Sequence, residues 1–206
     1  SDSFTYTIGD GNGGSDTATV TITVTGVNDS PKAVSDSGAT DEDTVLNGAA
    51  PGVLGNDTDP DDESLTVTAY DATSAQGAEV TVNADGSYSY DPTGMTAFQT
   101  LAIGETAADS FSYTIGDGNG GSDDTMVIIT VTGVNDDPTA VNDSGTTDED
   151  TVLNATAPGV LGNDTDPDGD TLAVIASATT STEGAVVTVN ADGSYDYDPT
   201  GVAAFQ

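Results

Sequence analysis

The sequence predicts an all-β fold built from tandem seven-strand β-sandwiches with a period of 107 residues. Val and Thr are abundant, and Gly, Ser, Asp and Asn recur at short intervals, as expected of short strands joined by many turns. Two segments also repeat: residues 3–14 recur almost unchanged at 110–121, and residues 41–47 recur at 148–154. Because both offsets are 107, the repeating unit has the length of a whole domain.

The repeat divides the chain into three parts. We predict that residues 1–29 are the last two strands of a preceding repeat, that 30–136 form one complete repeat, and that 137–206 are the first strands of an incomplete one. The chain therefore begins inside a repeat, which favours a slice of a longer array. Two periods exceed the chain by eight residues, and the missing piece corresponds to residues 100–107.

The elements of the complete repeat follow from alternating apolar residues and turn residues. Residues 84–86 are a hairpin turn with Gly86 at the position that needs a positive φ, and 93–105 are a long crossing loop. Strands are expected at 32–43, 45–54, 65–69, 79–83, 87–90, 111–115 and 127–131, and the second of them is interrupted by Pro51 and Gly52. Seven short strands with this turn spacing predict an immunoglobulin-like sandwich.

The charge excludes two classes of partner. The chain has 36 acidic residues and one basic residue, Lys32, so its formal net charge is −35. Nucleic-acid binding requires Lys and Arg, and an anionic membrane surface would repel this chain. We therefore expect no nucleic-acid partner and no membrane insertion. Such charge opposes compaction unless cations neutralise it, which a saline habitat or specific metal sites could provide.

An acidic loop at residues 56–63, repeated at 163–170, predicts calcium sites. Its alternating Asp residues can direct several carboxylates at one hard cation, and Ca²⁺ takes six to eight oxygen ligands. The second copy matches the opening of an EF-hand loop, but Ile175 stands where that motif needs Glu. The alternative is a solvated acidic turn. Because the chain has no Cys and no His, disulfide and thiolate staples are excluded, and Ca²⁺ is the expected substitute.

Three motifs resemble those of bacterial cadherin-like repeats, the VCBS or bacterial Ig-like modules of large RTX and biofilm adhesins. They are Gly-Val-Asn-Asp-x-Pro at 26–31 and 133–138, the Asp-x-Asp-Pro-Asp loop, and Tyr-Thr-Ile-Gly-Asp-Gly-Asn-Gly-Gly. The resemblance implies a cadherin-like β-sandwich, Ca²⁺ at the junctions between repeats, and an extracellular or cell-surface location. It also implies that the junction Asn-Asp shares ions with the next repeat's loop and with Glu42 of the preceding repeat.

Topology supports the same grouping without the resemblance. In a seven-strand Greek-key sandwich, the loop after the second strand and the loop before the last strand lie at the end where the chain enters, so their carboxylates would repel without a cation. The candidate ligands are Asn28, Asp29, Glu42, Asp57, Asp59, Asp61, Asp117, Asn119, Asn135, Asp136, Asp164, Asp166 and Asp168.

Catalysis has little support in the sequence. Asp36-Ser37-Gly38 and its repeat at 143–145 resemble the Asp-Ser-Gly of aspartic proteases, but they lack the apolar flanks that bury a catalytic dyad. A serine nucleophile would need a general base, and no His is present. We therefore expect no enzyme.

Two functions from different classes remain. The first is a calcium-stiffened spacer in an extracellular fibre or adhesin stalk, serving cell adhesion or a biofilm matrix. The second is a module that binds a ligand or glycan on a cell-surface or matrix partner. Head-to-tail filaments are expected because residues 1–29 and 137–206 are complementary. Donated strands between copies and one continuous chain both fit, and a cut inside a loop favours the continuous chain.

Overall fold

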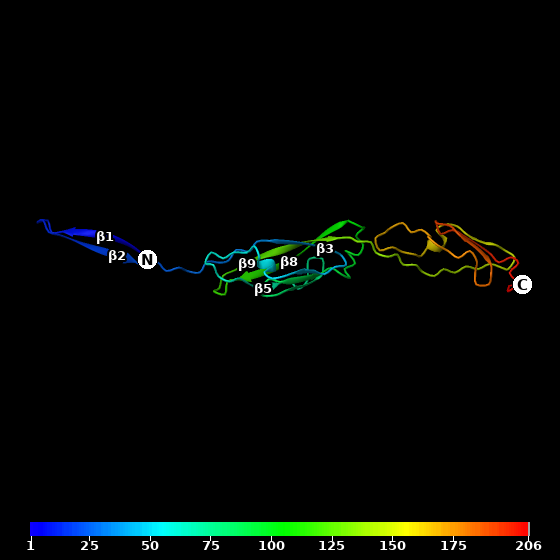
Figure 1. Cartoon of the computed structure of the whole chain (residues 1–206), viewed down its shortest axis with the longest axis horizontal. Helices are drawn as coiled ribbons and strands as arrows, with labels where there is room; N and C mark the ends of the chain where they lie inside the picture. Colours follow the sequence, from blue (N-terminus) through cyan, green and yellow to red (C-terminus); the bar gives the residue numbers. More distant parts are fainter. Residues whose placement is uncertain (206) are drawn as a thin grey trace.

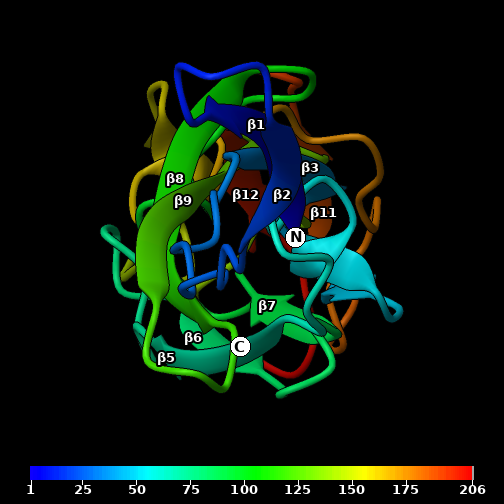
Figure 2. The same ribbon diagram turned by 90° about the vertical axis from the view of Figure 1, so that its left-hand side faces the viewer.

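The computed structural model describes residues 1–205, and Gln206, which corresponds to Gln99, lies outside the described residues. The molecule is a row of three parts, with the N-terminal hairpin at one end and the C-terminus at the other (Figure 1). These parts are the N-terminal hairpin (residues 1–29), the central sandwich (residues 30–136) and the C-terminal partial sandwich (residues 137–205). An end-on view places the hairpin in front of the other two parts (Figure 2).

The central sandwich contains all seven predicted strands. They are β3 (Asp36–Asp41), β4 (Leu46–Gly48), β5 (Thr66–Tyr70), β6 (Glu79–Val82), β7 (Tyr88–Asp91), β8 (Thr106–Gly116) and β9 (Ser122–Thr132), with a 3-10 turn η1 (Gly52–Leu54) after β4. One sheet has the order β3-β9-β8-β5 and the other β4-β7-β6. The first strand, β3, runs parallel to the last, β9, and all other pairs are antiparallel.

The core lies between these two sheets. Strands β8 and β9 supply six side chains that are at most 2% exposed, namely Phe111, Tyr113, Ile115, Val127, Ile129 and Val131. The opposite sheet and its loops supply Val53, Val80, Val82, Tyr90 and Phe98. The alternation predicted from the sequence therefore places every second residue of the β8–β9 hairpin in the core.

The C-terminal partial sandwich has only the smaller sheet. It contains β10 (Leu153–Ala155), η2 (Gly159–Leu161), β11 (Val186–Val189) and β12 (Tyr195–Asp198), in the sheet order β10-β12-β11. The segments that correspond to β3 and β5, residues 143–148 and 173–177, form no strand among the described residues. Both β3 and β5 pair only with β9 and β8, and the partial sandwich has no equivalents of those two strands.

The N-terminal hairpin consists of β1 (Asp2–Gly9) and β2 (Ser15–Ile22), which pair only with each other. Its apolar side chains are exposed, including Phe4 at 55%, Ile8 at 61% and Val24 at 74%. An isolated two-stranded hairpin is at best marginally stable in water.

Two expectations about individual strands were wrong. The second strand was expected to continue to 54 after an interruption at Pro51 and Gly52, but β4 ends at Gly48 and the strand does not resume. Gly52 has a φ of +52° and Pro51 has no N–H to donate to a ladder, so the chain turns into η1 instead. Ala69 does not continue the buried alternation of Val67, because a β-bulge between these residues turns Ala69 outward.

Candidate calcium sites at the two ends of the central sandwich

The first acidic cluster lies at the end of the central sandwich that faces the hairpin. The loop after η1 folds back, so that the backbones of Lys32 and Thr58 form a two-bond bridge. This fold-back carries Asp59 and Glu63 to Asp117, which ends the β8 side of the last hairpin. One carboxylate oxygen from each of these three residues lies within 4.8 Å of the other two. We name this group cluster 1.

The junction residues hold cluster 1 in place. The Asn28 side-chain amide donates to Asp117 Oδ2 at 2.8 Å, and the Asp29 N–H donates to Asp61 Oδ2 at 2.8 Å. Asn119 donates to Glu63 through its side-chain amide. The Asn28 hydrogen bond, with backbone N–H groups of the 119–121 turn, holds the pKa of Asp117 below its usual value. Asp117 therefore stays ionised.

The second acidic cluster lies at the other end of the central sandwich and joins it to the following part. It combines Glu42, which follows β3, with Asp136 of the junction and Asp168 of the next acidic loop. The Val134 N–H donates to Glu42 Oε1 at 2.8 Å, and the Asp136 N–H donates to Asp168 Oδ2 at 2.8 Å. We name this group cluster 2. Its carboxylates come from two consecutive repeats.

Among residues 1–205, buried carboxylate oxygens without a hydrogen-bond partner occur only in these two clusters. Glu42 is fully buried, yet its Oε2 has no hydrogen-bond partner. Across residues 1–205, the buried side-chain oxygens without a partner belong to Glu42, Asp59, Glu63, Asp136 and Asp168. Burying a carboxylate oxygen without a donor or a cation is costly. Both clusters therefore fit a hard cation that takes oxygen ligands, as Ca²⁺ does.

The remaining candidate ligands have other surroundings. Asp57 accepts a hydrogen bond from the Val34 N–H at 2.7 Å, and Asp164 accepts one from the Val141 N–H at 2.8 Å. Both carboxylates thus bind the backbone near the start of their repeat, and neither belongs to a cluster. Asn135 donates to the Asp136 carbonyl. The rest of the acidic loop after the second junction forms a third group, Asp166, Asp168 and Asp170.

Sequence reasoning missed Glu63 and Asp170. Both end the acidic loop, four residues after Asp59 and Asp166 respectively. The sequence did contain a signal for both residues, because each is the last acidic residue of its loop. Both residues continue the alternation of the loop, but the predicted ligand set ended one step earlier, at Asp61 and Asp168. Only the fold-back of the loop shows that the last acid also returns to the other carboxylates.

The family match agrees with this architecture. The bacterial cadherin-like domain family matches the sequence twice, at residues 28–133 and at residues 135–205. The chain belongs to the bacterial cadherin-like domain family. Residues 1–23 match a bacterial Ig domain. No curated protein matches the sequence at a significant level.

Bacterial cadherin-like and Ig domains are typically non-catalytic structural modules, and they usually occur in extracellular or surface proteins. Cadherin-like domains generally bind Ca²⁺, and the acidic clusters of this cadherin-like chain are consistent with that chemistry. Among residues 1–205, no helix is long and apolar enough to cross a membrane.

Without a cation, cluster 2 should make stability fall as pH rises. Burial, followed by the charges of Asp136 and Asp168, raises the pKa of Glu42 above its ordinary 4.5, and burial raises that of Asp136 above 3.8. Folding then favours the protonated forms of these two acids. Their contribution to the stability of the folded state is therefore fully present below the ordinary pKa values, and it is lost as the pH rises through the raised pKa values of the folded state.

Melting temperatures in calcium-free buffer between pH 4 and pH 8 measure this effect. Glu42→Gln should flatten the fall, because the replaced side chain does not titrate. Glu149→Gln is the matched control, since Glu149 is the corresponding residue but is exposed. An equal slope in Glu42→Gln and in the parent chain would contradict the assignment.

Proposed function

We propose that this chain is a calcium-stiffened spacer in an extracellular fibre or adhesin stalk. The proposal rests on one observation: in the described part of the chain, buried carboxylate oxygens without a partner occur only in clusters 1 and 2, at the two ends of the central sandwich. A cation in cluster 2 would bind Glu42 from one repeat together with Asp168 from the next. It would therefore fix the angle between consecutive repeats.

The chain itself cannot neutralise these clusters. Lys32 is its only basic side chain, against 36 acidic residues. The backbone N–H groups of Val134 and Asp136 each satisfy one carboxylate oxygen of cluster 2 and leave the other oxygens for an external ligand. In cluster 2, Ca²⁺ would supply the positive charge and accept ligands in a loose geometry. The protein would supply preformed oxygen ligands on either side of the junction.

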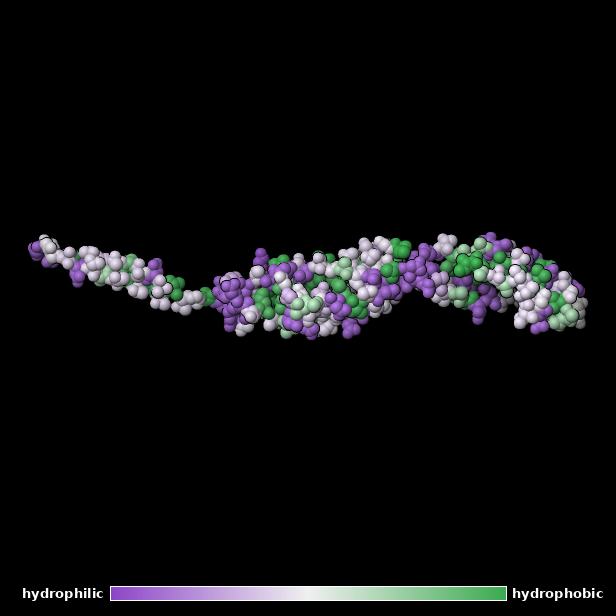
Figure 3. Space-filling view, viewed as in Figure 1, coloured by the Kyte–Doolittle hydropathy of each residue, from purple (hydrophilic) through white to green (hydrophobic). Residues whose placement is uncertain are grey.

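The extended arrangement also favours a spacer. The three parts lie in a row (Figure 1), and hydrophilic residues gather at the second junction on the face that Figure 3 shows, where Glu42, Asp136 and Asp168 converge. Without a cation, the charges of Asp136, Asp168 and Glu42 repel one another. The junction would then bend freely, so the local calcium concentration would set the stiffness of the fibre.

Small-angle scattering on the monomer fraction of a size-exclusion column tests the proposal. In Ca²⁺ the parent chain should give a narrow distribution of lengths, and in chelator a broad one. The double variant Glu42→Gln, Asp168→Asn should be broad in both conditions, because cluster 2 then keeps only the carboxylate of Asp136.

The matched control is Glu149→Gln, Asp124→Asn, which removes the same number of charges from two exposed residues outside clusters 1 and 2. It should retain the narrow distribution in Ca²⁺. A junction that is equally extended in the double variant and in the parent with Ca²⁺ would show that cluster 2 bears no bridging ion.

A further inference from the structure

The apolar face of the N-terminal hairpin is the same face that fills the core of the central sandwich. The corresponding side chains, 107 positions apart, are Phe4 and Phe111, Tyr6 and Tyr113, Ile8 and Ile115, Val20 and Val127, Ile22 and Ile129, and Val24 and Val131. On β8 and β9 these side chains are at most 2% exposed, whereas Phe4, Tyr6, Ile8 and Ile22 are 46–61% exposed on the hairpin. The hairpin therefore exposes the apolar face that is buried in the core when the same sequence occurs in the central sandwich.

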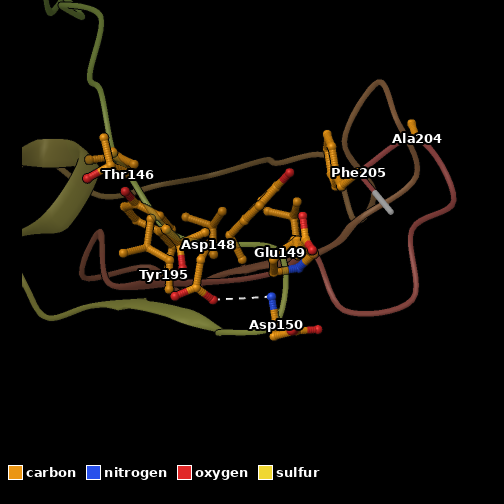
Figure 4. Close-up of a pocket in the computed structure, with 15 residues that line it drawn as sticks. Thr146, Asp148, Glu149, Asp150, Tyr195, Ala204 and Phe205 are labelled. Carbon is orange, nitrogen blue, oxygen red and sulfur yellow. Dashed lines mark hydrogen bonds between the residues drawn. The ribbon is translucent and has the colours of Figure 1, made fainter.

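The C-terminal partial sandwich has the complementary defect. An open groove of about 1080 Å³ runs over the inner face of its three-stranded sheet (Figure 4). Its lining includes Val160, Val187, Val189, Tyr197 and Phe205. Their equivalents in the central sandwich are Val53, Val80, Val82, Tyr90 and Phe98, which are at most 5% exposed beneath β8 and β9. The groove is the space that a β8–β9 hairpin occupies one repeat earlier.

The unpaired backbone segments beside the groove need the same occupant. Residues 143–148 and 173–177 correspond to β3 and β5, and neither forms a strand. In the central sandwich, β3 pairs along Asp36–Asp41 with β9, and β5 pairs with β8. A hairpin seated in the groove would offer both edges for these ladders, as strand addition to an open sheet does.

Polar groups of the groove and the hairpin also match. In the central sandwich, Asp109 accepts hydrogen bonds from the hydroxyls of Tyr90 and Ser74, and the Tyr113 hydroxyl donates to Asp36 at 2.8 Å. In the partial sandwich the donors persist as Tyr197 and Ser181, and the acceptor persists as Asp143. Their missing partners are present on the hairpin, as Asp2 and Tyr6.

We propose that the β1–β2 hairpin of one copy fills the groove of the C-terminal partial sandwich of a second copy. The chain's own hairpin cannot reach the groove, because the whole central sandwich separates them (Figure 1). Each copy keeps one free hairpin and one free groove, so the contact is head to tail and does not close. The product is a linear filament.

Docking would also complete acidic clusters across the boundary between copies, a consequence that rests on the proposed calcium function. Asp10 corresponds to Asp117 and would join Asp166 and Asp170 of the other copy, which correspond to Asp59 and Glu63. Glu149 corresponds to Glu42 and would likewise meet a junction. Calcium should therefore strengthen the filament.

Light scattering coupled to size exclusion tests the proposal with chains of residues 1–206 in Ca²⁺. The parent should form species at multiples of 20.4 kDa that grow with concentration. The donor variant Phe4→Asp, Ile8→Asp should raise the dissociation constant at least ~100-fold, because docking would bury two unpaired carboxylates. Thr5→Asp is the matched control and should assemble like the parent, since Ser112, its equivalent on β8, faces solvent.

A mixture of two variants distinguishes the loss of the interface from misfolding of a variant. The acceptor variant Val189→Asp places a charge in the groove and should also fail to self-associate. An equimolar mixture of donor and acceptor variants should give dimers and nothing larger, because one copy retains an intact groove and the other an intact hairpin. This outcome does not require the groove of Val189→Asp to remain folded.

Two results would overturn the proposal. One is a parent that stays at 20.4 kDa up to roughly millimolar concentration, because the hairpin of one copy then does not enter the groove of another. The other is a mixture that stays monomeric. If chelator leaves both assembly and melting unchanged, the calcium function fails while strand donation stands, so the two failures are distinguishable.

Discussion

Removal of calcium is expected to lower the melting temperature of the central sandwich by roughly 6 to 20 °C. Extracellular calcium modules bind with dissociation constants of about 10⁻⁴ to 10⁻³ M. At about 10 mM Ca²⁺, one such site stabilises the folded state by roughly 1.4 to 2.7 kcal/mol. For a domain of about 100 residues, each kcal/mol shifts the melting temperature by roughly 4 to 8 °C.

The measurement is a thermal scan with Ca²⁺ and then with chelator at constant ionic strength. Glu63→Gln, Asp117→Asn should remove the part of the shift that cluster 1 contributes, because this cluster then keeps only the carboxylate of Asp59 while cluster 2 is unchanged. Asp124→Asn is a matched control, since this exposed residue lies outside the clusters. A shift that NaCl reproduces in place of Ca²⁺ would favour general screening of the net charge of −35 over specific sites.

Replacing Asp109 with Ala should destabilise the central sandwich by roughly 3 kcal/mol or more. Asp109 is 4% exposed and accepts hydrogen bonds from the Ser74 and Tyr90 hydroxyls and from the Gln76 N–H. Burial and the bond to Asp109 raise the pKa of Tyr90, so this hydroxyl remains a donor. The substitution would leave these buried donors without an acceptor.

Chemical unfolding of the parent, of Asp109→Ala and of Asp2→Ala measures the effect. Asp2 is the corresponding residue on β1, but it is exposed in the hairpin. Asp2→Ala should therefore leave the central sandwich as stable as the parent in a monomeric sample and weaken only self-association. Equal losses of stability in the two variants would contradict the role assigned to the Asp109 network.

The sequence by itself determined the all-β class and the location of most strands. The alternation at 111–115 and at 127–131 was sufficient, because residues two apart on a strand share a face and only one face can be buried. Local backbone chemistry was harder to foresee. Pro51 and Gly52 mark an interruption in the sequence, but they do not show that the strand fails to resume after the 3-10 turn. The bulge after Val67 leaves the apolar alternation of the sequence unchanged, so it has no periodic signal.

The candidate ion sites divide in the same way. Their residue types were evident from the sequence, because repeated Asp in a turn is a local pattern, and Greek-key topology predicted that the loops of one end meet. Only the tertiary structure decided which carboxylates converge. Asp57 faces a backbone N–H while Glu63 turns back to Asp117, because the bridge between Lys32 and Thr58 fixes the direction of the loop.

The contrast between Glu42 and Glu149 shows what sequence alone cannot decide. Both stand in the same Asp-Glu-Asp triplet, yet Glu42 is fully buried and Glu149 is exposed. The difference arises because β9 and the junction that follows it cover Glu42, whereas Glu149 has no such neighbour in this chain. Burial and carboxylate repulsion are properties of the assembled sandwich, so identical residues acquire different chemistry wherever the fold supplies different neighbours.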